Sequence, residues 1–144
     1  MKEKFKRIYM KNAHVFSELS MSRRLKVGAV VVKDDNIIAW GYNGTPAGWD
    51  NNCEDEFLNE DGSVSLVTKV EVLHAEMNSL MKLARSHESG LNATLFCTHS
   101  PCVECAKGIY QAGIKEVYYE SDYRSTDGVD FLVKCGIKVE KIST

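Results

Sequence analysis

Hydrophobic and polar positions divide the first third of the chain into one helix and two strands. Apolar side chains recur at helical spacing near the N-terminus, which predicts a helix that packs one face on a core. This stripe consists of Phe5, Ile8, Tyr9, Asn12, Ala13, Phe16 and Leu19. Residues 27–33 and 37–42 are β-branched and apolar runs separated by Asp34, Asp35 and Asn36, which tight turns favour. They predict two antiparallel strands joined by a hairpin.

The rest of the chain begins with a long polar segment and then alternates between helix and strand. Residues 43–73 are rich in Gly, Asn and Asp and have no clear period, so we expect a long loop, which in a small domain is usually functional. Met77, Leu80, Met81 and Ala84 indicate an amphipathic helix that Gly90 ends. Further predicted strands cover residues 93–98, 116–119 and 137–140, and further helices cover about 101–112 and 125–135.

Strands separated by helices imply right-handed crossover connections and a parallel half-sheet with helices on its faces. Together with the antiparallel hairpin, this pattern predicts an α/β fold, a three-layer α/β/α sandwich around a five-stranded mixed sheet. The 144 residues are enough for one core and too few for two ordinary ones, so a single domain over residues 1–144 is expected.

Composition and charge exclude several classes of protein. The chain is 44% hydrophobic and 26% charged, which is typical of globular domains, and no apolar run approaches the roughly 20 residues of a membrane-spanning helix. The formal net charge of -2 lacks the basic excess of polynucleotide-binding proteins, so we expect no nucleic-acid partner. The charged residues 1–7 are not followed by an apolar signal stretch, and a cytoplasmic location is therefore expected, in the host cytoplasm if the source is viral.

The cysteines point to metal chemistry. An odd number at uneven positions suits reduced thiols or metal ligands better than a disulfide framework; they are Cys53, Cys97, Cys102, Cys105 and Cys135. Cys102 and Cys105 lie in Pro-Cys-Val-Glu-Cys, directly after a predicted strand and at the start of a predicted helix. Thiolates are favoured at a helix N-terminus, so this pair is predisposed to bind Zn²⁺.

The start of a second predicted helix carries His74-Ala-Glu76, which supplies an imidazole and a carboxylate. His74, Cys102 and Cys105 make three protein ligands, and a site with three ligands leaves the fourth position for water, as catalytic zinc sites do. Glu76 can then take a proton from that water. A closed structural site made of Cys97, His99 and the two helix cysteines remains an alternative, in which His74 is an ordinary polar residue.

The joint pattern of His-Ala-Glu followed by Pro-Cys-Val-Glu-Cys resembles the zinc-dependent cytidine and deoxycytidylate deaminase superfamily. The predicted order of strands and helices around the motifs matches that family as well, so the resemblance covers nearly the whole chain. It implies a cytidine deaminase-like fold and zinc held by His74, Cys102 and Cys105. It also implies that Glu76 is the catalytic acid and base.

Another segment narrows the choice of substrate. Gly41-Tyr-Asn-Gly-Thr-Pro-Ala-Gly48 is similar to an element of deoxycytidylate deaminases, although Asn-Gly and Pro are also ordinary turn formers. The resemblance implies hydrolysis of dCMP to dUMP and ammonia, a step toward thymidylate. In that reaction an activated hydroxide attacks C4 of cytosine, and Glu76 protonates N3 and then the departing amino group.

The same resemblance assigns four residues to substrate binding. Asn43 matches the asparagine that contacts the substrate, and the backbone groups of Ala75 and Ser100 match those that read the pyrimidine edge. Tyr123 matches an aromatic residue that caps the pocket, although a partly exposed loop tyrosine would have the same sequence signal.

The phosphate of a nucleotide needs a cationic contact. Arg23, Arg24 and Lys26 form the one local basic cluster near the expected mouth of the site, and Lys26 is the residue we choose from it. A solvated group of charges at the end of the first helix is the alternative interpretation.

Assembly and regulation also follow from the resemblance. It implies a homohexamer, activation by dCTP and inhibition by dTTP with Mg²⁺, at an allosteric site whose residues the sequence leaves unknown. Some viral members hold a second, structural zinc with cysteines before the first strand. This chain has Met21 and Ser22 there, which leaves Cys53 without an evident partner.

Four other functions remain open on the sequence. A bifunctional dCMP and dCTP deaminase differs only in the room around the phosphates. A tRNA or polynucleotide deaminase shares the zinc chemistry but needs a basic, aromatic surface. A non-catalytic zinc module would not depend on Glu76, and a thiol-disulfide oxidoreductase built on Cys102 and Cys105 gives His74 and Glu76 no role.

Overall fold

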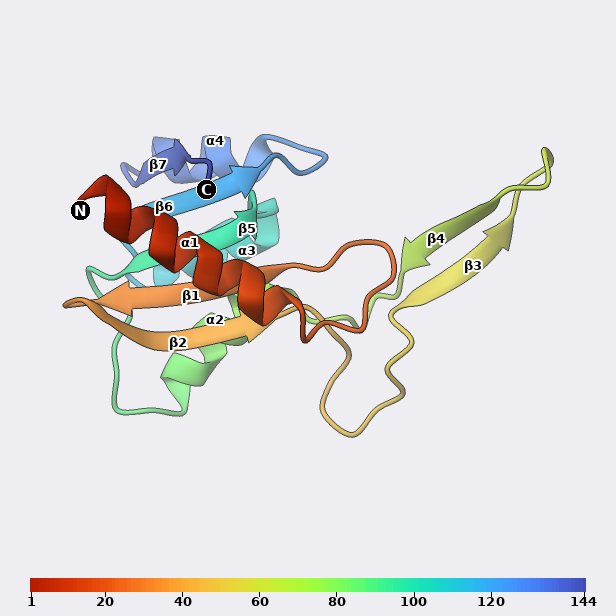
Figure 1. Ribbon diagram of the computed structural model, residues 1–144, viewed down its shortest axis with the longest axis horizontal. Coiled ribbons are helices and arrows are strands. Elements are labelled where there is room, and N and C mark those ends of the chain that lie inside the picture. Colours follow the sequence, from red (N-terminus) through yellow and green to blue (C-terminus); the bar gives the residue numbers. More distant parts are fainter.

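A five-stranded mixed sheet forms the centre of the molecule, in a computed structural model that describes residues 1–144 (Figure 1). The strand order is β2-β1-β5-β6-β7; β1 is antiparallel to β2 and β5, whereas β5, β6 and β7 are parallel. These strands are β1 (Gly28–Lys33), β2 (Asn36–Tyr42), β5 (Thr94–His99), β6 (Glu116–Ser121) and β7 (Lys138–Lys141). The predicted sheet is confirmed.

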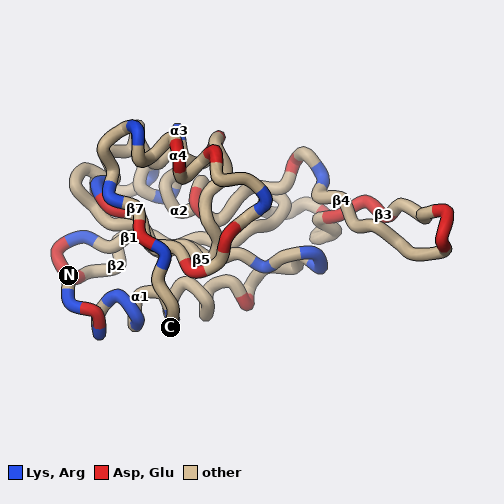
Figure 2. Tube along the Cα trace, turned by 90° about the horizontal axis from the view of Figure 1, so that it is seen from above, with Lys and Arg blue, Asp and Glu red and all other residues tan.

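Helices cover both faces of this sheet. Helix α1 (Glu3–Ser17) packs on one face, and α2 (Ala75–Ala84), α3 (Val103–Gln111) and α4 (Asp127–Lys134) pack on the other (Figures 1 and 2). The three-layer α/β/α sandwich is therefore confirmed. None of the helices combines the length and the hydropathy that crossing a bilayer requires. Segments of Lys and Arg and segments of Asp and Glu are interspersed over the trace in Figure 2, so both signs of charge are spread over the molecule.

Strand β1 explains why its sequence is almost continuously apolar. Successive side chains of a strand point to opposite faces, and both faces of this sheet are covered by helices. Ala29 and Val31 belong to the core cluster beneath α2, α3 and α4, whereas Val30 and Val32 belong to the cluster beneath α1. All four residues are buried, so the run Ala-Val-Val-Val fills two cores at once.

The turn between β1 and β2 has the predicted residues. Asp34 and Asp35 have φ angles of 50° and 62°. A two-residue hairpin loop requires this left-handed conformation to match the right-handed twist of the flanking strands. Asn36 supports the turn, because its Nδ2 donates to the carbonyl oxygen of Asp34 at 2.9 Å.

The predicted stripe of α1 is only partly buried. Tyr9 and Ala13 face the sheet, whereas Phe5, Ile8 and Leu19 are exposed. The sequence stripe was too wide for one contact face, since its members lie on two neighbouring sides of the helix. The expectation that all of them pack on the core is wrong. Helix α2 likewise ends at Ala84, well before Gly90.

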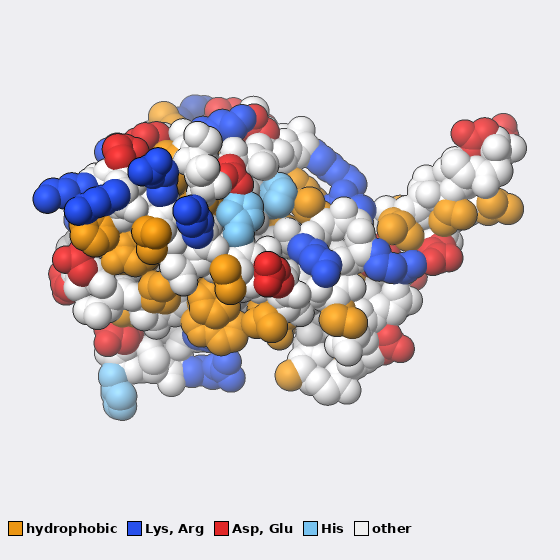
Figure 3. All heavy atoms as spheres, viewed as in Figure 1, with side chains coloured by type: hydrophobic (Ala, Val, Ile, Leu, Met, Phe, Trp, Pro, Cys, Tyr) orange, Lys and Arg blue, Asp and Glu red, His pale blue; other side chains and the backbone are white.

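The segment 43–73 is not an unstructured loop, which corrects the prediction. It contains strands β3 (Glu54–Leu58) and β4 (Val64–Thr68), which form a separate two-stranded sheet that projects from the body (Figures 1 and 3). The sequence signal was weak because acidic residues are depleted in strands, and β3 begins Glu-Asp-Glu. The space-filling view shows apolar side chains along this hairpin and acidic ones at its tip.

Candidate metal centre and substrate cavity

Two helix N-termini converge on the predicted metal ligands. His74 is the N-cap residue of α2, and Cys102 is the N-cap residue of α3, where its Sγ accepts from the backbone N–H of Cys105 at 3.5 Å. The Nδ1 atom of His74 lies 3.5 Å from Sγ of Cys102 and 3.3 Å from Sγ of Cys105. The structure thus gathers the three residues that the sequence assigned to zinc.

The spacing of these atoms fits a zinc ion. Tetrahedral zinc with a Zn–S distance of about 2.3 Å and a Zn–N distance of about 2.05 Å separates the nitrogen and sulfur ligands by roughly 3.5 Å. The alternative closed site is not formed, because Cys97 and His99 are not part of the cluster. The Cys97 thiol is buried and lies 3.7 Å from the carbonyl oxygen of Tyr118. Three protein ligands leave a coordination position open, as in catalytic zinc sites.

The thiols of Cys102 and Cys105 have pKa values shifted in opposite directions. The pKa of Cys102 is lowered to about 3, because Cys105 and then His74 hydrogen-bond to its sulfur. The pKa of Cys105 is raised in turn, chiefly by the neighbouring Cys102 and by burial. The pKa of His74 is raised because the Cys102 sulfur accepts its hydrogen bond. The thiolate form is therefore favoured at Cys102.

Glu76 is a buried carboxyl beside this centre. It is 4% exposed and belongs to the first turn of α2, two residues after His74. Burial raises its pKa to about 7, an effect that the neighbouring imidazole of His74 partly opposes. A carboxyl with a pKa near neutrality can both accept and donate a proton at neutral pH.

Glycines bring the backbone segments of the centre close together. A Cβ atom on Gly41 would lie 2.5 Å from the carbonyl oxygen of Ala75, so only glycine lets β2 approach the start of α2. Gly44 forms two backbone hydrogen bonds with Leu73, of 3.0 and 2.8 Å, which fix the residue before His74. The Gly-Tyr-Asn-Gly segment therefore shapes the chain around the metal ligand as well as lining the cavity.

A cavity extends from the metal ligands toward the segment that precedes β1. Its lining comes from five parts of the chain: Ser22, Arg24, Leu25, Val27, Asn43, Thr68, Val72, His74, Ala75, Glu76, His99, Ser100, Cys102 and Tyr123. Four of the five predicted substrate residues are in this lining, namely Asn43, Ala75, Ser100 and Tyr123. Lys26 is not, and its side chain is exposed.

Asn43 uses one acceptor position and one N–H of its side-chain amide on the backbone. Its Oδ1 accepts from the N–H of Val27 at 2.8 Å, and its Nδ2 donates to the carbonyl oxygen of Leu25 at 2.8 Å. One N–H of the amide remains for a ligand. Asn43 therefore fixes the residues between the basic cluster and β1, a structural role that the sequence did not indicate.

Ser100 and Ala75 differ in whether their backbone N–H groups are already used within the protein. The N–H of Ser100 already donates to Ser121 at 2.9 Å, and its Oγ accepts from the N–H of Tyr123 at 2.8 Å. Ser100 therefore places Tyr123 at the cavity. Ala75 is the first residue of α2, where backbone N–H groups have no partner within the helix.

Arg24 occupies the place at the cavity that the sequence gave to Lys26. Its Nη2 donates to the hydroxyl of Tyr123 at 2.8 Å, and its Nε donates to Oγ1 of Thr68 at 3.1 Å. The basic cluster was a correct signal for a cation at the cavity. The choice within it could not be made from sequence, because Thr68 and Tyr123 are distant in the chain.

His99, which the sequence offered only as an alternative metal ligand, also lines the cavity. Thr98 Oγ1 accepts from the backbone N–H of Gly28 at 3.2 Å, and it lies 2.9 Å from Nδ1 of His99. Burial lowers the pKa of His99, which favours the neutral imidazole.

A hydrogen bond joins the segment before β1 to the projecting hairpin. The Oγ of Ser22 donates to Oε2 of Glu54 at 2.6 Å. The Cys53 thiol lies 3.6 Å from the carbonyl oxygen of Asn51, and Cys53 belongs to no metal-binding cluster.

A three-ligand centre at two helix N-termini, with a buried carboxyl beside it in a three-layer sandwich, defines a zinc-dependent hydrolytic deaminase. The family described as the cytidine and deoxycytidylate deaminase zinc-binding region matches residues 3–121. The chain belongs to this family.

The alignments with individual relatives cover most of this chain. The deoxycytidylate deaminase of Saccharomyces cerevisiae is 38% identical over 94% of this chain, which spans only 44% of the yeast protein. The deoxycytidylate deaminase of Enterobacteria phage T4 is 32% identical over 88% of this chain and 84% of its own length. The crystal structure of dCMP deaminase from cyanophage S-TIM5, in complex with dCMP and dUMP, covers 99% of both chains with a TM-score of 0.88 and 52% identity.

Proposed function

We propose that this chain hydrolyses dCMP to dUMP and ammonia and so supplies dUMP for thymidylate synthesis. The observation that carries the proposal is one cavity lined by both the metal centre with Glu76 and the guanidinium of Arg24. The first end can deaminate a cytosine ring, and the second can bind a phosphate. The similarity to the cyanophage enzyme crystallised with dCMP and dUMP supports this choice of substrate.

Glu76 carries the protons of the reaction. When bound to His74, Cys102 and Cys105, zinc supplies Lewis acidity and a water activated at neutral pH. Glu76 takes a proton from the attacking water as the new bond to C4 forms, and it delivers this proton to N3. It then transfers the second proton of this water to the amino group, which leaves as ammonia when the C4–N bond breaks. The burial of Glu76 suits this work, because it keeps the pKa of the carboxyl near neutrality.

Arg24 and Tyr123 form the phosphate end of the site. The Tyr123 hydroxyl accepts a hydrogen bond from Arg24, so its own proton is free to be donated to a ligand. Arginine has five N–H groups, and two of them are used by Tyr123 and Thr68. The remaining donors and the fixed positive charge suit a phosphate. We therefore assign the phosphate to Arg24 in place of Lys26.

An absorbance assay tests the proposed function. Purified protein with its zinc content measured is given dCMP, dCTP and cytidine separately, and deamination is followed by the fall in ultraviolet absorbance. We expect rapid turnover of dCMP and far slower turnover of cytidine, which lacks the phosphate. No turnover of dCMP at one zinc per chain would contradict the proposal. Turnover of dCTP as well would favour the bifunctional alternative.

Regulation, assembly and location stay predictions of the family resemblance. They are activation by dCTP and inhibition by dTTP with Mg²⁺, a homohexamer, and residence in the cytoplasm. The effector claim is tested by adding dCTP or dTTP to the dCMP assay, and the hexamer by sedimentation of the zinc-loaded protein.

A further inference from the structure

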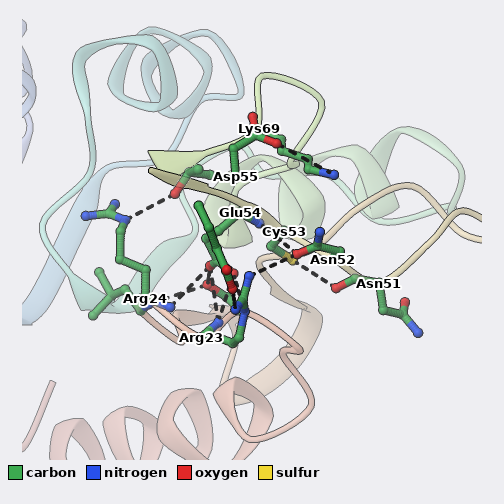
Figure 4. Close-up of polar contacts among 12 residues, drawn as sticks. Arg23, Arg24, Asn51, Asn52, Cys53, Glu54, Asp55 and Lys69 are labelled. Atoms are coloured by element: carbon green, nitrogen blue, oxygen red, sulfur yellow. Dashed lines mark hydrogen bonds and ion pairs between the residues drawn. The ribbon is translucent and has the colours of Figure 1, made fainter. Parts of the chain in front are cut away.

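A buried carboxylate outside the metal centre lies behind Arg24. Glu54 is the first residue of β3, and its side chain has an exposed fraction of 0%. It accepts hydrogen bonds from Oγ of Ser22 at 2.6 Å and from the backbone N–H groups of Arg23 and Arg24, at 3.1 and 3.2 Å (Figure 4). A fully buried charge is costly unless it is paired and hydrogen-bonded. Here three hydrogen-bond donors meet that need together with the Arg23 side chain, whose Nε lies 3.6 Å from Oε1 of Glu54.

These contacts fix a segment that has no regular structure. Residues 20–27 belong to neither a helix nor a strand, so their backbone N–H groups need other acceptors. The Glu54 carboxylate accepts from two consecutive N–H groups and thereby sets the backbone position of Arg24. The Arg24 side chain then extends away from Glu54 (Figure 4).

The opposite strand of the hairpin holds the other end of Arg24. Thr68 of β4 pairs directly with Glu54 in the register of the hairpin. Its Oγ1 accepts from Nε of Arg24, at 3.1 Å. One cross-strand pair thus holds both the backbone and the guanidinium of Arg24. This pair connects the projecting hairpin to the substrate cavity, which both Arg24 and Thr68 line.

We propose that Glu54 is the positioning residue that holds Arg24 at the cavity, and that it thereby determines the preference of the site for a 5′-phosphate over a bare nucleoside. The inference rests on the proposed function, because it takes the phosphate of dCMP as the ligand of Arg24. Glu54 itself does not touch the substrate, since it is not among the lining residues. Its effect passes through the backbone of residues 22–24.

Replacement of Glu54 by glutamine separates this role from that of a space filler. Glutamine has nearly the same shape but presents an NH₂ group where one carboxylate oxygen accepts now. That group would face donors rather than acceptors, so at least one backbone N–H of the 22–24 segment would lose its partner. Glu56 offers a matched control on the same strand, because its side chain is 58% exposed and pairs only with Arg23.

The experiment compares kcat/KM for dCMP and for deoxycytidine in wild type, Glu54→Gln and Glu56→Gln. We expect Glu54→Gln to lower the ratio of the two values by roughly tenfold to a hundredfold, mainly through KM for dCMP. Deoxycytidine turnover and zinc content should match wild type, and Glu56→Gln should keep the wild-type ratio. An equal loss for both substrates, or an unchanged ratio, would overturn the inference.

A double variant tests whether Glu54 acts through Arg24. In an Arg24→Ala background, Glu54→Gln should cause no further loss of the ratio, because the group that it positions is gone. Additive losses would overturn the inference. If Glu54→Gln does not fold, Thr68→Val removes the hydrogen bond that Arg24 Nε makes to the other residue of the cross-strand pair, and it leaves the Glu54 carboxylate in place. It should also lower the ratio, and an unchanged ratio would then decide against the inference.

The proposed function can fail separately. Wild-type protein that does not turn over dCMP would contradict the proposed function alone. Calorimetric titration with dUMP and with deoxyuridine would then decide the inference. Tighter binding of dUMP in wild type, reduced in Glu54→Gln, would support it, whereas equal binding by both proteins would overturn it.

Discussion

The two ends of the cavity are built in different ways. The metal end consists of residues within a few positions of two helix N-termini, so short sequence motifs define His74, Glu76, Cys102 and Cys105. The proposed phosphate end consists of Arg24 and of residues that hold it from strands and loops far away in the sequence. Local geometry places the reactive groups, whereas long-range contacts place the cation that we propose as the selector of the substrate.

This difference has a consequence for mutation. A change at the metal end should remove catalysis for every substrate. A change at the phosphate end should alter the choice between substrates and leave the chemistry of the cytosine ring intact.

Glu76→Gln should abolish turnover while the metal end stays assembled. Glutamine cannot carry a proton, and loss of general acid–base catalysis costs on the order of a hundredfold to ten-thousandfold in kcat. Zinc content should not change, because Glu76 is not one of the three ligands. Stopped absorbance assays and metal analysis check both parts. Full activity in this variant would show that another group moves the protons.

Arg24→Ala should weaken the binding of dCMP without affecting the turnover of deoxycytidine. The loss of charge-assisted hydrogen bonds to a phosphate should raise KM for dCMP by roughly tenfold to a hundredfold. Values of kcat/KM for the two substrates, measured side by side, check this. A parallel fall for deoxycytidine would mean that the two ends of the cavity are not separable.

Glu54 should make stability depend on pH. Burial alone would raise its pKa, but the hydrogen bonds from Ser22 and from the N–H groups of Arg23 and Arg24 hold it below the ordinary value. The folded pKa is lowered, so the contribution of Glu54 is complete above the unfolded pKa of about 4.3 and is lost as the pH falls through the folded value. Glu54→Gln should therefore be less stable than wild type by about 1–3 kcal/mol at pH 7, and by less at pH 3.

Urea unfolding of both proteins at pH 7 and pH 3 measures this difference. Glu56→Gln should match wild type at both values, because this exposed side chain makes a surface ion pair. A gap between Glu54→Gln and wild type that is equally large at the two pH values would contradict the account of this carboxylate.

Lys26→Ala should have the smallest effect. The side chain is exposed and lies outside the cavity lining, so the dCMP to deoxycytidine ratio should change by less than about twofold. A loss as large as that of Arg24→Ala would return the phosphate contact to Lys26.

The same contrast explains which parts of the molecule could be predicted from the sequence. The sheet and helices followed from apolar periodicity, as in β1, and the metal ligands followed from residues at helix starts. The hairpin of β3 and β4 was missed because its acidic strand lacks strand propensity. Arg24 could not be chosen from its cluster because its contacts to Thr68 and Tyr123 exist only in the fold.

The most direct test of the two-ended cavity is the ratio of kcat/KM for dCMP to that for deoxycytidine, in zinc-loaded wild type and Arg24→Ala. The account predicts a strong preference for dCMP in wild type, and a variant that loses this preference while its deoxycytidine turnover is unchanged. Equal use of the two substrates by wild type, or equal losses for both in the variant, would contradict it.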